Sequence, residues 1–295
     1  MSIFTEFPEM SRTDLRDLKK GVDEAFRSFT RANGEAIENF FFPLLKFLVW
    51  FEKLLISTPW PIMILVLCAL VWAGSRSWGL VVGTVLVLLL IGYLGMWEDT
   101  MFTIALISVA TMICIVIGIP LGIVMSKSDR TQAVITPVLD IMQTIPSFVY
   151  LIPILMLLGI GKVPGLIAVC IYAVPPVVRL TNLGIRLVDR DVLEAADAFG
   201  ASPRQKLWTV QIPLALPNIF AGVNQTIMMA LAMVVVAALI GVHGLGQQVL
   251  KAVNNQYLAL GMMNGLAIVA IAIVFDRVSQ KYGQRLQKHT EVIHG

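Results

Sequence analysis

Long apolar runs separated by short polar loops make up most of the chain. Each run approaches the roughly 20 apolar residues that a helix needs to cross the hydrocarbon core of a bilayer. We therefore expect about seven membrane-spanning helices, over residues 57–73, 79–96, 101–125, 138–160, 164–185, 217–241 and 258–276. The pattern predicts an all-α polytopic membrane protein.

The composition excludes an ordinary soluble domain. The chain is 57% hydrophobic and 14% charged, with a mean hydropathy of +0.82, whereas soluble domains carry about 25% charged residues. The net charge of +3 is small and spread among the loops, so no nucleic-acid partner is expected. The cysteines lie inside apolar runs, where a thiol is usually a small hydrophobe, and no metal site is predicted. They are Cys68, Cys114 and Cys170.

The chain begins with a charged N-terminal tail, residues 1–35, which lacks the apolar core of a cleavable signal peptide. Its apolar residues recur at helical spacing, which is typical of an amphipathic helix, and a loosely held tail is the alternative. Residues 36–56 are more apolar, but the charged residues in and beside them, such as Glu38 and Glu52, fall within one helical sector. This one-sided stripe favours an amphipathic helix in the membrane interface over a true span.

Lysine and arginine gather in alternate loops, which predicts the orientation. The loops on one side carry Arg76, Lys127, Arg130, Arg186, Arg190, Arg204, Lys206, Arg277, Lys281, Arg285 and Lys288. This side is predicted to be cytoplasmic, together with the C-terminal tail, residues 281–295. Seven spans then place the N-terminal tail outside, whereas a crossing by residues 38–55 would place it inside.

The 186–216 loop has the local signals of two short, stiff helices. Asp191 followed by Glu194 predicts a capping box, and Gly200 is the residue expected at a left-handed helix end. A protruding pair of helices between two apolar segments suits docking of another protein.

The second short helix of this loop is predicted from its start and stop signals. Ser202 is the expected N-cap, Pro203 occupies the first helical position, and Gln205 completes a capping box. Pro213 and Pro217 are expected to stop the helix.

A stripe of polar residues runs along the fourth predicted span, where burial of polar groups is costly. It consists of Thr136, Asp140, Gln143, Thr144, Ser147 and Tyr150, with Pro146 breaking the helix beside it. The stripe is either one wall of a solute pathway or a set of hydrogen bonds between helices. In the sixth span, Asn224 and the flexible Met229 are further pathway candidates, although methionine also fills cores.

Glycines interrupt the chain after the sixth span. Gly241, Gly244 and Gly246 predict an external loop or a re-entrant bend, followed by a short interfacial helix.

Known catalytic and nucleotide-binding motifs are missing from the sequence. It contains no GxxxxGK[ST], HExxH or GxSxG pattern. We therefore expect no enzymatic activity and no ATP held by this chain, so that energy for any transport must come from a partner.

The 186–216 loop resembles the EAA loop of ATP-binding-cassette importer permeases. That pattern is Glu-Ala-Ala, three residues, Gly, nine residues and Ile-x-Leu-Pro. The matching segments here are Glu194-Ala195-Ala196, Gly200 and Val210-Gln211-Ile212-Pro213. Val210 and Ile212 are mild apolar departures from the pattern.

The resemblance covers about residues 98–280 and is nearest to the glycine betaine, choline and proline branch of that family. The finer match lies in Gln143–Phe148, Leu157–Gly161, Pro175–Arg179, Leu239–Gly241 and Gly244–Gly246. It implies a core permease domain over 98–280, preceded by two peripheral transmembrane helices over 57–97.

The resemblance also implies a type I importer fold, a homodimer of this permease in a bacterial inner membrane, and an extracytoplasmic substrate-binding protein. Two cytoplasmic ATPase subunits would use ATP and Mg. The implied ATPase-coupling residues are Glu194, Ala195, Ala196, Gly200, Ser202, Pro203, Ile212 and Pro213. The expected cargo is glycine betaine, choline, proline or a similar small solute. A permease for another solute, such as an amino acid, and a channel or scaffold without transport are the alternatives.

Overall fold

The protein is built from helices throughout the part of the chain that the structure describes. The structure is a computed structural model that describes the backbone of residues 9–294, and the side chains of 284 and 286–294 lie outside that description. Within the described residues, four stretches are long and apolar enough to cross a membrane. They are α4 (Trp97–Ser126), α7 (Lys162–Arg186), Pro203–Ala232, which contains α10 (Ile212–Ala232), and the Leu258–Gly283 part of α13 (Leu258–His294). Two bent helix pairs raise this number to six when each pair is counted as one span: Arg12–Ser57 with Trp60–Ser75, and Asp129–Thr144 with Ser147–Leu158. The predicted all-α membrane class is confirmed, and the length criterion supports four to six spans rather than seven.

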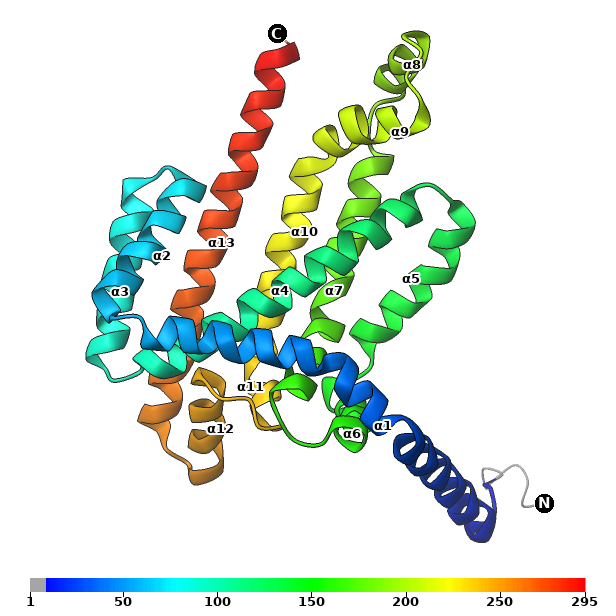
Figure 1. Ribbon diagram of the computed structural model, residues 1–295, viewed down its shortest axis with the longest axis vertical. Helices are drawn as coiled ribbons and strands as arrows, with labels where there is room; N and C mark the ends of the chain where they lie inside the picture. The colour runs from blue at the N-terminus through cyan, green and yellow to red at the C-terminus, as the bar shows by residue number, and fades with distance from the viewer. Residues whose placement is uncertain (1–8, 295) are drawn as a thin grey trace, which may run out of the picture.

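The core is formed where α4, α7 and α10 pack side by side (Figure 1). Glycines allow their close approach, as is common between membrane helices. A Cβ atom added at Gly118 of α4 would lie 2.4 Å from Val177 Cγ1 of α7, and one added at Gly222 of α10 would lie 3.0 Å from Val177 Cα. A larger residue at either position would force these helices apart.

Two short helices form a hairpin at the edge of this core. α2 (Trp60–Ser75) and α3 (Trp78–Tyr93) have 16 residues each, so each spans about 24 Å. This is less than the roughly 30 Å of a bilayer core. Arg76, in the left-handed conformation with φ 50°, ends α2, and the hairpin packs against α13.

The predicted fourth span, residues 138–160, is broken at Pro146, as the sequence predicts. α5 (Asp129–Thr144) and α6 (Ser147–Leu158) meet at an angle of 96°. Pro146 lacks a backbone N–H and forces the residue before it out of the helical region. Ile145 is accordingly extended, with ψ 127°. The polar stripe is therefore divided between two helices.

The predicted stop at Pro213 and Pro217 is wrong. α9 (Pro203–Gln205) and the π-helix η1 (Lys206–Gln211) continue directly into α10. Pro213 lies where the π-helix η1 passes into α10, and this local change of hydrogen-bond pattern accommodates its missing N–H. Pro217 is accommodated one turn later inside α10. The sixth span ends earlier than 241, at Met233, and α11 (Val234–Ala238) follows.

The glycine loop after α11 has the predicted irregular backbone. Gly241 and Gly244 have φ values of 91° and 132°, which glycine adopts without strain. The backbone N–H of Leu245 donates to Thr103 Oγ1 at the start of α4, 3.0 Å away. The short helix predicted before the last span is α12 (Leu245–Asn255).

The N-terminal region forms one helix across the boundary expected at residue 35. α1 (Arg12–Ser57) includes most of the predicted tail and the whole predicted 36–56 helix, while residues 1–8 lie outside the described residues. Gly34 is the weak helix former at that boundary, and one glycine costs only about 1 kcal/mol relative to alanine. α1 meets α2 at 113° and runs across the direction of α10 and α13 (Figure 1).

A buried ion pair attaches α1 to the core. Glu52 is 5% exposed, and its carboxylate accepts a hydrogen bond from Lys162 Nζ at the start of α7. Lys162 Nζ also lies 5.4 Å from the centroid of the Phe102 ring. Part of the charged stripe of α1 thus contacts protein rather than lipid headgroups.

Candidate coupling loop and translocation pathway

The 186–216 loop leaves the core at Arg186, whose side chain fixes the end of α7. Its guanidinium donates to Asn182 Oδ1 (3.1 Å), to Asp129 Oδ1 (2.6 Å) and to the backbone oxygen of Met125 (3.1 Å). One residue therefore joins the end of α7 to the connection between α4 and α5. The sequence predicts Arg186 only as a cytoplasmic charge, because two of its three partners, Asp129 and Met125, lie more than fifty residues away.

The first short helix of the loop is α8 (Arg190–Ala198), and its N-cap differs from the predicted one. Asp189, not Asp191, is the N-cap, and its carboxylate accepts from the backbone N–H of Asp191 at 2.9 Å. Both aspartates can cap a helix chemically, and the extended backbone of Asp189 (ψ 135°) decides between them. The predicted capping box of Asp191 and Glu194 is thus wrong.

α8 ends at the glycine that the sequence predicts. Gly200 has φ 74°, its N–H donates to the oxygen of Asp197 at 2.9 Å, and the N–H of Ala201 donates to Ala196 at 3.0 Å. This pattern closes the helix end and reverses the chain.

The turn into the next helix is held by side chains. Ser202 and Gln205 form the predicted capping box, with distances of 2.9 and 3.3 Å, and Pro203 opens α9. Lys206 Nζ lies 2.6 and 2.7 Å from the two carboxylate oxygens of Asp197. The two short helices are therefore braced against each other.

One side of the loop is anchored in the membrane part of the protein. Leu207 is 4% exposed and packs with Ile185, Ala215 and Ile219, against which Ile212 also packs. The anchor lies in η1, a π-helical segment, and such segments often mark functional sites. A displacement of the loop must consequently move α7 and α10.

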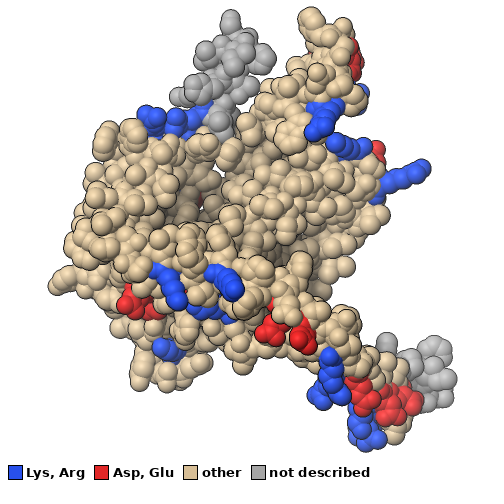
Figure 2. Space-filling view, in the orientation of Figure 1, with Lys and Arg blue, Asp and Glu red and all other residues tan. Residues whose placement is uncertain are grey.

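The other side of the loop is exposed and partly apolar. Glu194 and Ala195 are exposed, Ala196 is half-buried, and Phe199 is 92% exposed next to Gly200. Trp208 is 58% exposed. α8 and α9 project from the helix core at the same end of the protein as the C-terminal part of α13 (Figure 1), with charged side chains around them (Figure 2). Phe199 was missed by the sequence analysis, because its exposure depends on the turn at Gly200.

The structure brings together only part of the predicted pathway. Gln143 Nε2 of α5 lies 3.6 Å from Met229 Sδ of α10, and Tyr150 Oη of α6 lies 4.0 Å from Met233 Sδ. Ser147 is half-buried, whereas Thr144 and Pro146 are exposed near the break between α5 and α6.

Asn224 faces a different helix from the other pathway candidates. Its Nδ2 atom donates to Asp276 Oδ1 of α13 at 2.8 Å. This hydrogen bond joins α10 to α13, so Asn224 faces α13 rather than the α5–α6 segment.

Asp140 forms an ion pair with Arg179 of α7 at 2.5 Å, and both side chains are partly exposed. The two residues are 39 positions apart, and only the tertiary structure places them together. Within the described residues no group of three or more His, Cys, Asp or Glu side chains is placed to hold a metal ion.

The fold and the loop define a class of protein: a multi-pass membrane permease with a protruding loop. Residues 114–288 match the family described as the binding-protein-dependent transport system inner membrane component. The chain belongs to this family.

Curated relatives support the same assignment. The chain is 49% identical over 234 residues to the glycine betaine/proline betaine transport system permease protein ProW of Escherichia coli, covering 79% of this chain and 66% of ProW. It is 47% identical over 229 residues to the glycine betaine/carnitine transport permease protein GbuB of Listeria monocytogenes, covering 77% and 81%. The match spans slightly less than two thirds of ProW in Escherichia coli and 62% of ProW in Salmonella typhimurium.

Among solved structures, inward-facing MetNI, a methionine ABC transporter, has a similar fold. A chain of it matches with a TM-score of 0.57 and 18% identity, covering 63% of this chain and 93% of that chain.

Proposed function

We propose that this chain is the permease subunit of an ATP-driven importer for a small quaternary amine or related compatible solute. Glycine betaine is the first candidate cargo, with proline betaine, carnitine and choline close behind, since these solutes appear in the names of its relatives. A bacterial inner membrane is the proposed location, as the family description states for its members.

The observation that carries this proposal is the construction of the 186–216 loop. It presents exposed apolar side chains, Phe199 and Trp208, outside the apolar spans, while Leu207 anchors its other side in the core. An exposed aromatic patch on a stiff support is typical of a protein-docking surface. We infer that a separate ATPase, which holds ATP and Mg, docks here, and that this chain binds neither.

The coupling residues have distinct proposed tasks. Glu194, Ala195 and Ala196 present the docking face of α8, Gly200 makes the turn, and Ser202 with Pro203 starts the second helix. Ile212 and Pro213 pass the motion into α10.

The proposed pathway runs along α5 and α6. Both helices expose large apolar side chains, among them Val138, Ile141 and Phe148, so we infer that a second copy of the chain completes the pathway from the other side. Its proposed lining residues are Asp140, Gln143, Thr144, Pro146, Ser147, Tyr150 and Met229.

An extracytoplasmic binding protein would deliver the solute to this pathway. Approach of the two ATPases would pull the two 186–216 loops together and open the cavity outward.

A charge reversal tests docking. Glu194→Arg is expected to reduce uptake of radiolabelled glycine betaine and stimulated ATPase activity at least tenfold in proteoliposomes, because it places an opposite charge in the docking face. Arg190→Glu, on the same helix, is the matched control for reversing a charge. Normal uptake by the Glu194 variant would exclude the docking role.

The cargo is tested in the same system with the binding protein included. If uptake of glycine betaine is saturable and an excess of proline does not reduce it, the cargo is restricted to quaternary amines. Uptake of amino acids alone would favour the alternative permease, and solute flux without nucleotide would favour a channel.

A further inference from the structure

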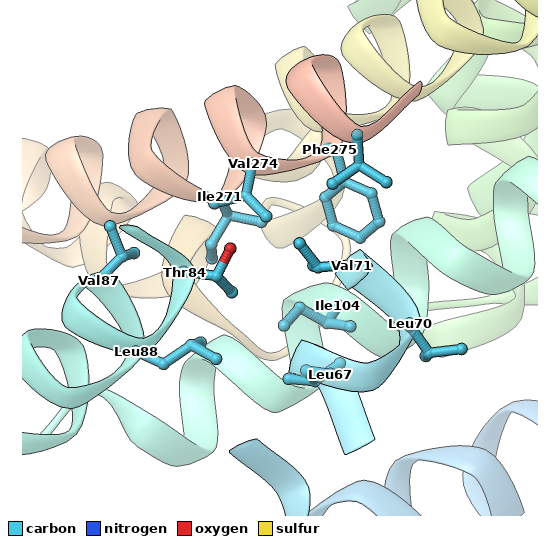
Figure 3. A pocket seen from close by; sticks show the side chains of 11 residues that line it. Leu67, Leu70, Val71, Thr84, Val87, Leu88, Ile104, Ile271, Val274 and Phe275 are labelled. Carbon is cyan, nitrogen blue, oxygen red and sulfur yellow. The ribbon is translucent and has the colours of Figure 1, made fainter. Parts of the chain in front are cut away.

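An apolar pocket lies between the peripheral helices α2 and α3 and the long helices α4 and α13 (Figure 3). Its cavity has a volume of about 150 Å³. Among its walls are Val71, Thr84, Leu88, Ile104, Val274 and Phe275. Thr84 uses its hydroxyl to donate to the backbone oxygen of Leu80, so it offers the cavity no unpaired donor. Such a cavity takes up an apolar group rather than water.

The pocket is open on the side of α2. Leu70 lines it and is nevertheless 63% exposed. Since α2 lies at the edge of the helix bundle, a flexible hydrocarbon chain can reach the pocket from the surrounding lipid.

One face of α13 changes from apolar to basic just beyond the pocket. Ile271, Val274, Val278, Lys281 and Arg285 follow one another at spacings of three or four residues, which places them on one face of the helix. The first three line the pocket. From Ile271 to Arg285 the helix rises about 21 Å. The hydrocarbon of one bilayer leaflet is only about 15 Å thick, so the basic end of this face reaches the level of the lipid headgroups when Ile271 lies in the hydrocarbon.

The basic residues are held in place at the end of α2. Lys281 Nζ donates to Ser77 Oγ at 2.7 Å, and an Arg285 NH1 group donates to the backbone oxygen of Ala73 at 3.1 Å. The guanidinium of Arg76 lies 4.5 Å from the centroid of the Trp72 ring. Three cations are thus fixed around one helix end.

No acidic side chain of the described residues forms an ion pair with any of these three cations. Figure 2 shows basic side chains gathered at this end of the protein, over α2 and α13. A concentrated positive charge beside an apolar cavity matches the two parts of a negatively charged lipid.

We propose that this pocket binds an anionic phospholipid. One acyl chain fills the cavity, and the phosphate lies among Arg76, Lys281 and Arg285. A basic pocket between membrane helices attracts anionic headgroups, whereas a zwitterionic lipid would leave the net charge of the site uncompensated. The inference goes beyond the proposed transport function and requires only that the chain is inserted in a membrane.

Lipid retention tests the headgroup part of the site. The purified protein is mixed with dioleoyl phosphatidylglycerol or dioleoyl phosphatidylcholine, and native mass spectrometry counts the retained lipids. The double variant Lys281→Gln with Arg285→Gln is expected to retain phosphatidylglycerol about 10- to 30-fold more weakly, which corresponds to two cations near an anionic headgroup. Lys127→Gln with Arg130→Gln removes the same charge at the same end of the protein, away from the pocket, and is expected to retain it normally.

A second variant tests the cavity and distinguishes a loss of lipid binding from a folding defect. Lys281 and Arg285 also bond to α2, so their loss could loosen the hairpin. Val274→Phe fills the cavity and keeps those bonds, and it is expected to weaken retention of phosphatidylglycerol as well.

Three outcomes would overturn the proposal. The first is unchanged retention of phosphatidylglycerol by both the Lys281→Gln with Arg285→Gln variant and the Val274→Phe variant. The second is equal retention of phosphatidylcholine and phosphatidylglycerol by the unmodified protein. The third is displacement of the lipid by glycerol phosphate at equal concentration, which would indicate a free phosphate site. A photo-reactive residue in place of Leu70 that captures a protein in the native membrane, rather than a phospholipid, would also overturn it.

Discussion

The 186–216 loop and the α5–α6 segment are both interrupted, partly polar stretches, but they are held very differently. The loop has two capped helices, the brace between Asp197 and Lys206, and the buried anchor Leu207. In α5 and α6 only Leu139 and Leu151 are buried, and the two helices meet at a bend of 96°.

This difference indicates a division of tasks. Local opening costs little free energy where few apolar side chains are buried, so α5 and α6 are suited to move. α8 buries no side chain either, so its stiffness depends on the caps, on the ion pair between Asp197 and Lys206, and on the anchor Leu207. A stiff loop passes on a displacement without absorbing it.

Replacing Gly200 should have the largest effect on coupling. Gly200→Val forces a β-branched residue to φ 74°, and an L-residue in that region costs about 1–2 kcal/mol. No atom lies within 4 Å of the added Cβ, so the change distorts the turn rather than the core. We expect at least tenfold slower uptake with an unchanged melting temperature of the membrane part.

Gly79→Val is the control for this substitution, because the added Cβ also meets nothing within 4 Å and φ there is not positive. Similar uptake by the two variants would show that the turn geometry is unimportant.

Breaking the brace should have an intermediate effect. Lys206→Gln removes the ion pair with Asp197, whose carboxylate is about half exposed, so the expected loss of loop stability is only about 0.5 kcal/mol. We expect a two- to fivefold loss of stimulated ATPase activity and faster hydrogen exchange in α8.

The charge-swapped pair Asp197→Lys with Lys206→Asp should restore both readouts of the brace. If it does not, the two residues act separately and the loop is stiffened by its caps alone.

Replacing Gln143 should have the smallest effect. Gln143→Ala removes a weak contact with Met229 and one polar group from the proposed pathway, so we expect a two- to threefold change in the KM for uptake with normal binding of the ATPase. Asn224→Ala, which faces α13 instead, is expected to lower stability and leave the KM unchanged. If Asn224→Ala changes the KM for uptake and Gln143→Ala does not, the pathway lies on the α13 side of α10.

The sequence predicts much of the fold because many of its signals are local. Gly200 and the Ser202–Gln205 capping box need only neighbouring residues, and both are found in the structure. Other local signals did not decide the structure. The N-cap of α8 is Asp189 rather than Asp191, and Pro213 and Pro217 lie within a continuous helical stretch that they were expected to stop. Pro146, by contrast, separates α5 from α6 as expected. A proline in the sequence therefore does not by itself show where a membrane helix ends, because local changes in hydrogen-bond pattern can accommodate it.

By itself, the sequence determined the helical membrane class, the turn at Gly200 and the spacing of the 186–216 loop, because apolar length, backbone preference and capping act over a few residues. Only the tertiary structure decided which charged residues meet. Glu52 pairs with Lys162, Asp140 with Arg179, and Arg186 with Asp129, while Lys281 and Arg285 gather beside Arg76. These partners are separated by tens to hundreds of residues along the chain, and helix packing alone brings them together. The same packing turned a charged interruption of the sequence into a loop with one anchored side and one exposed side.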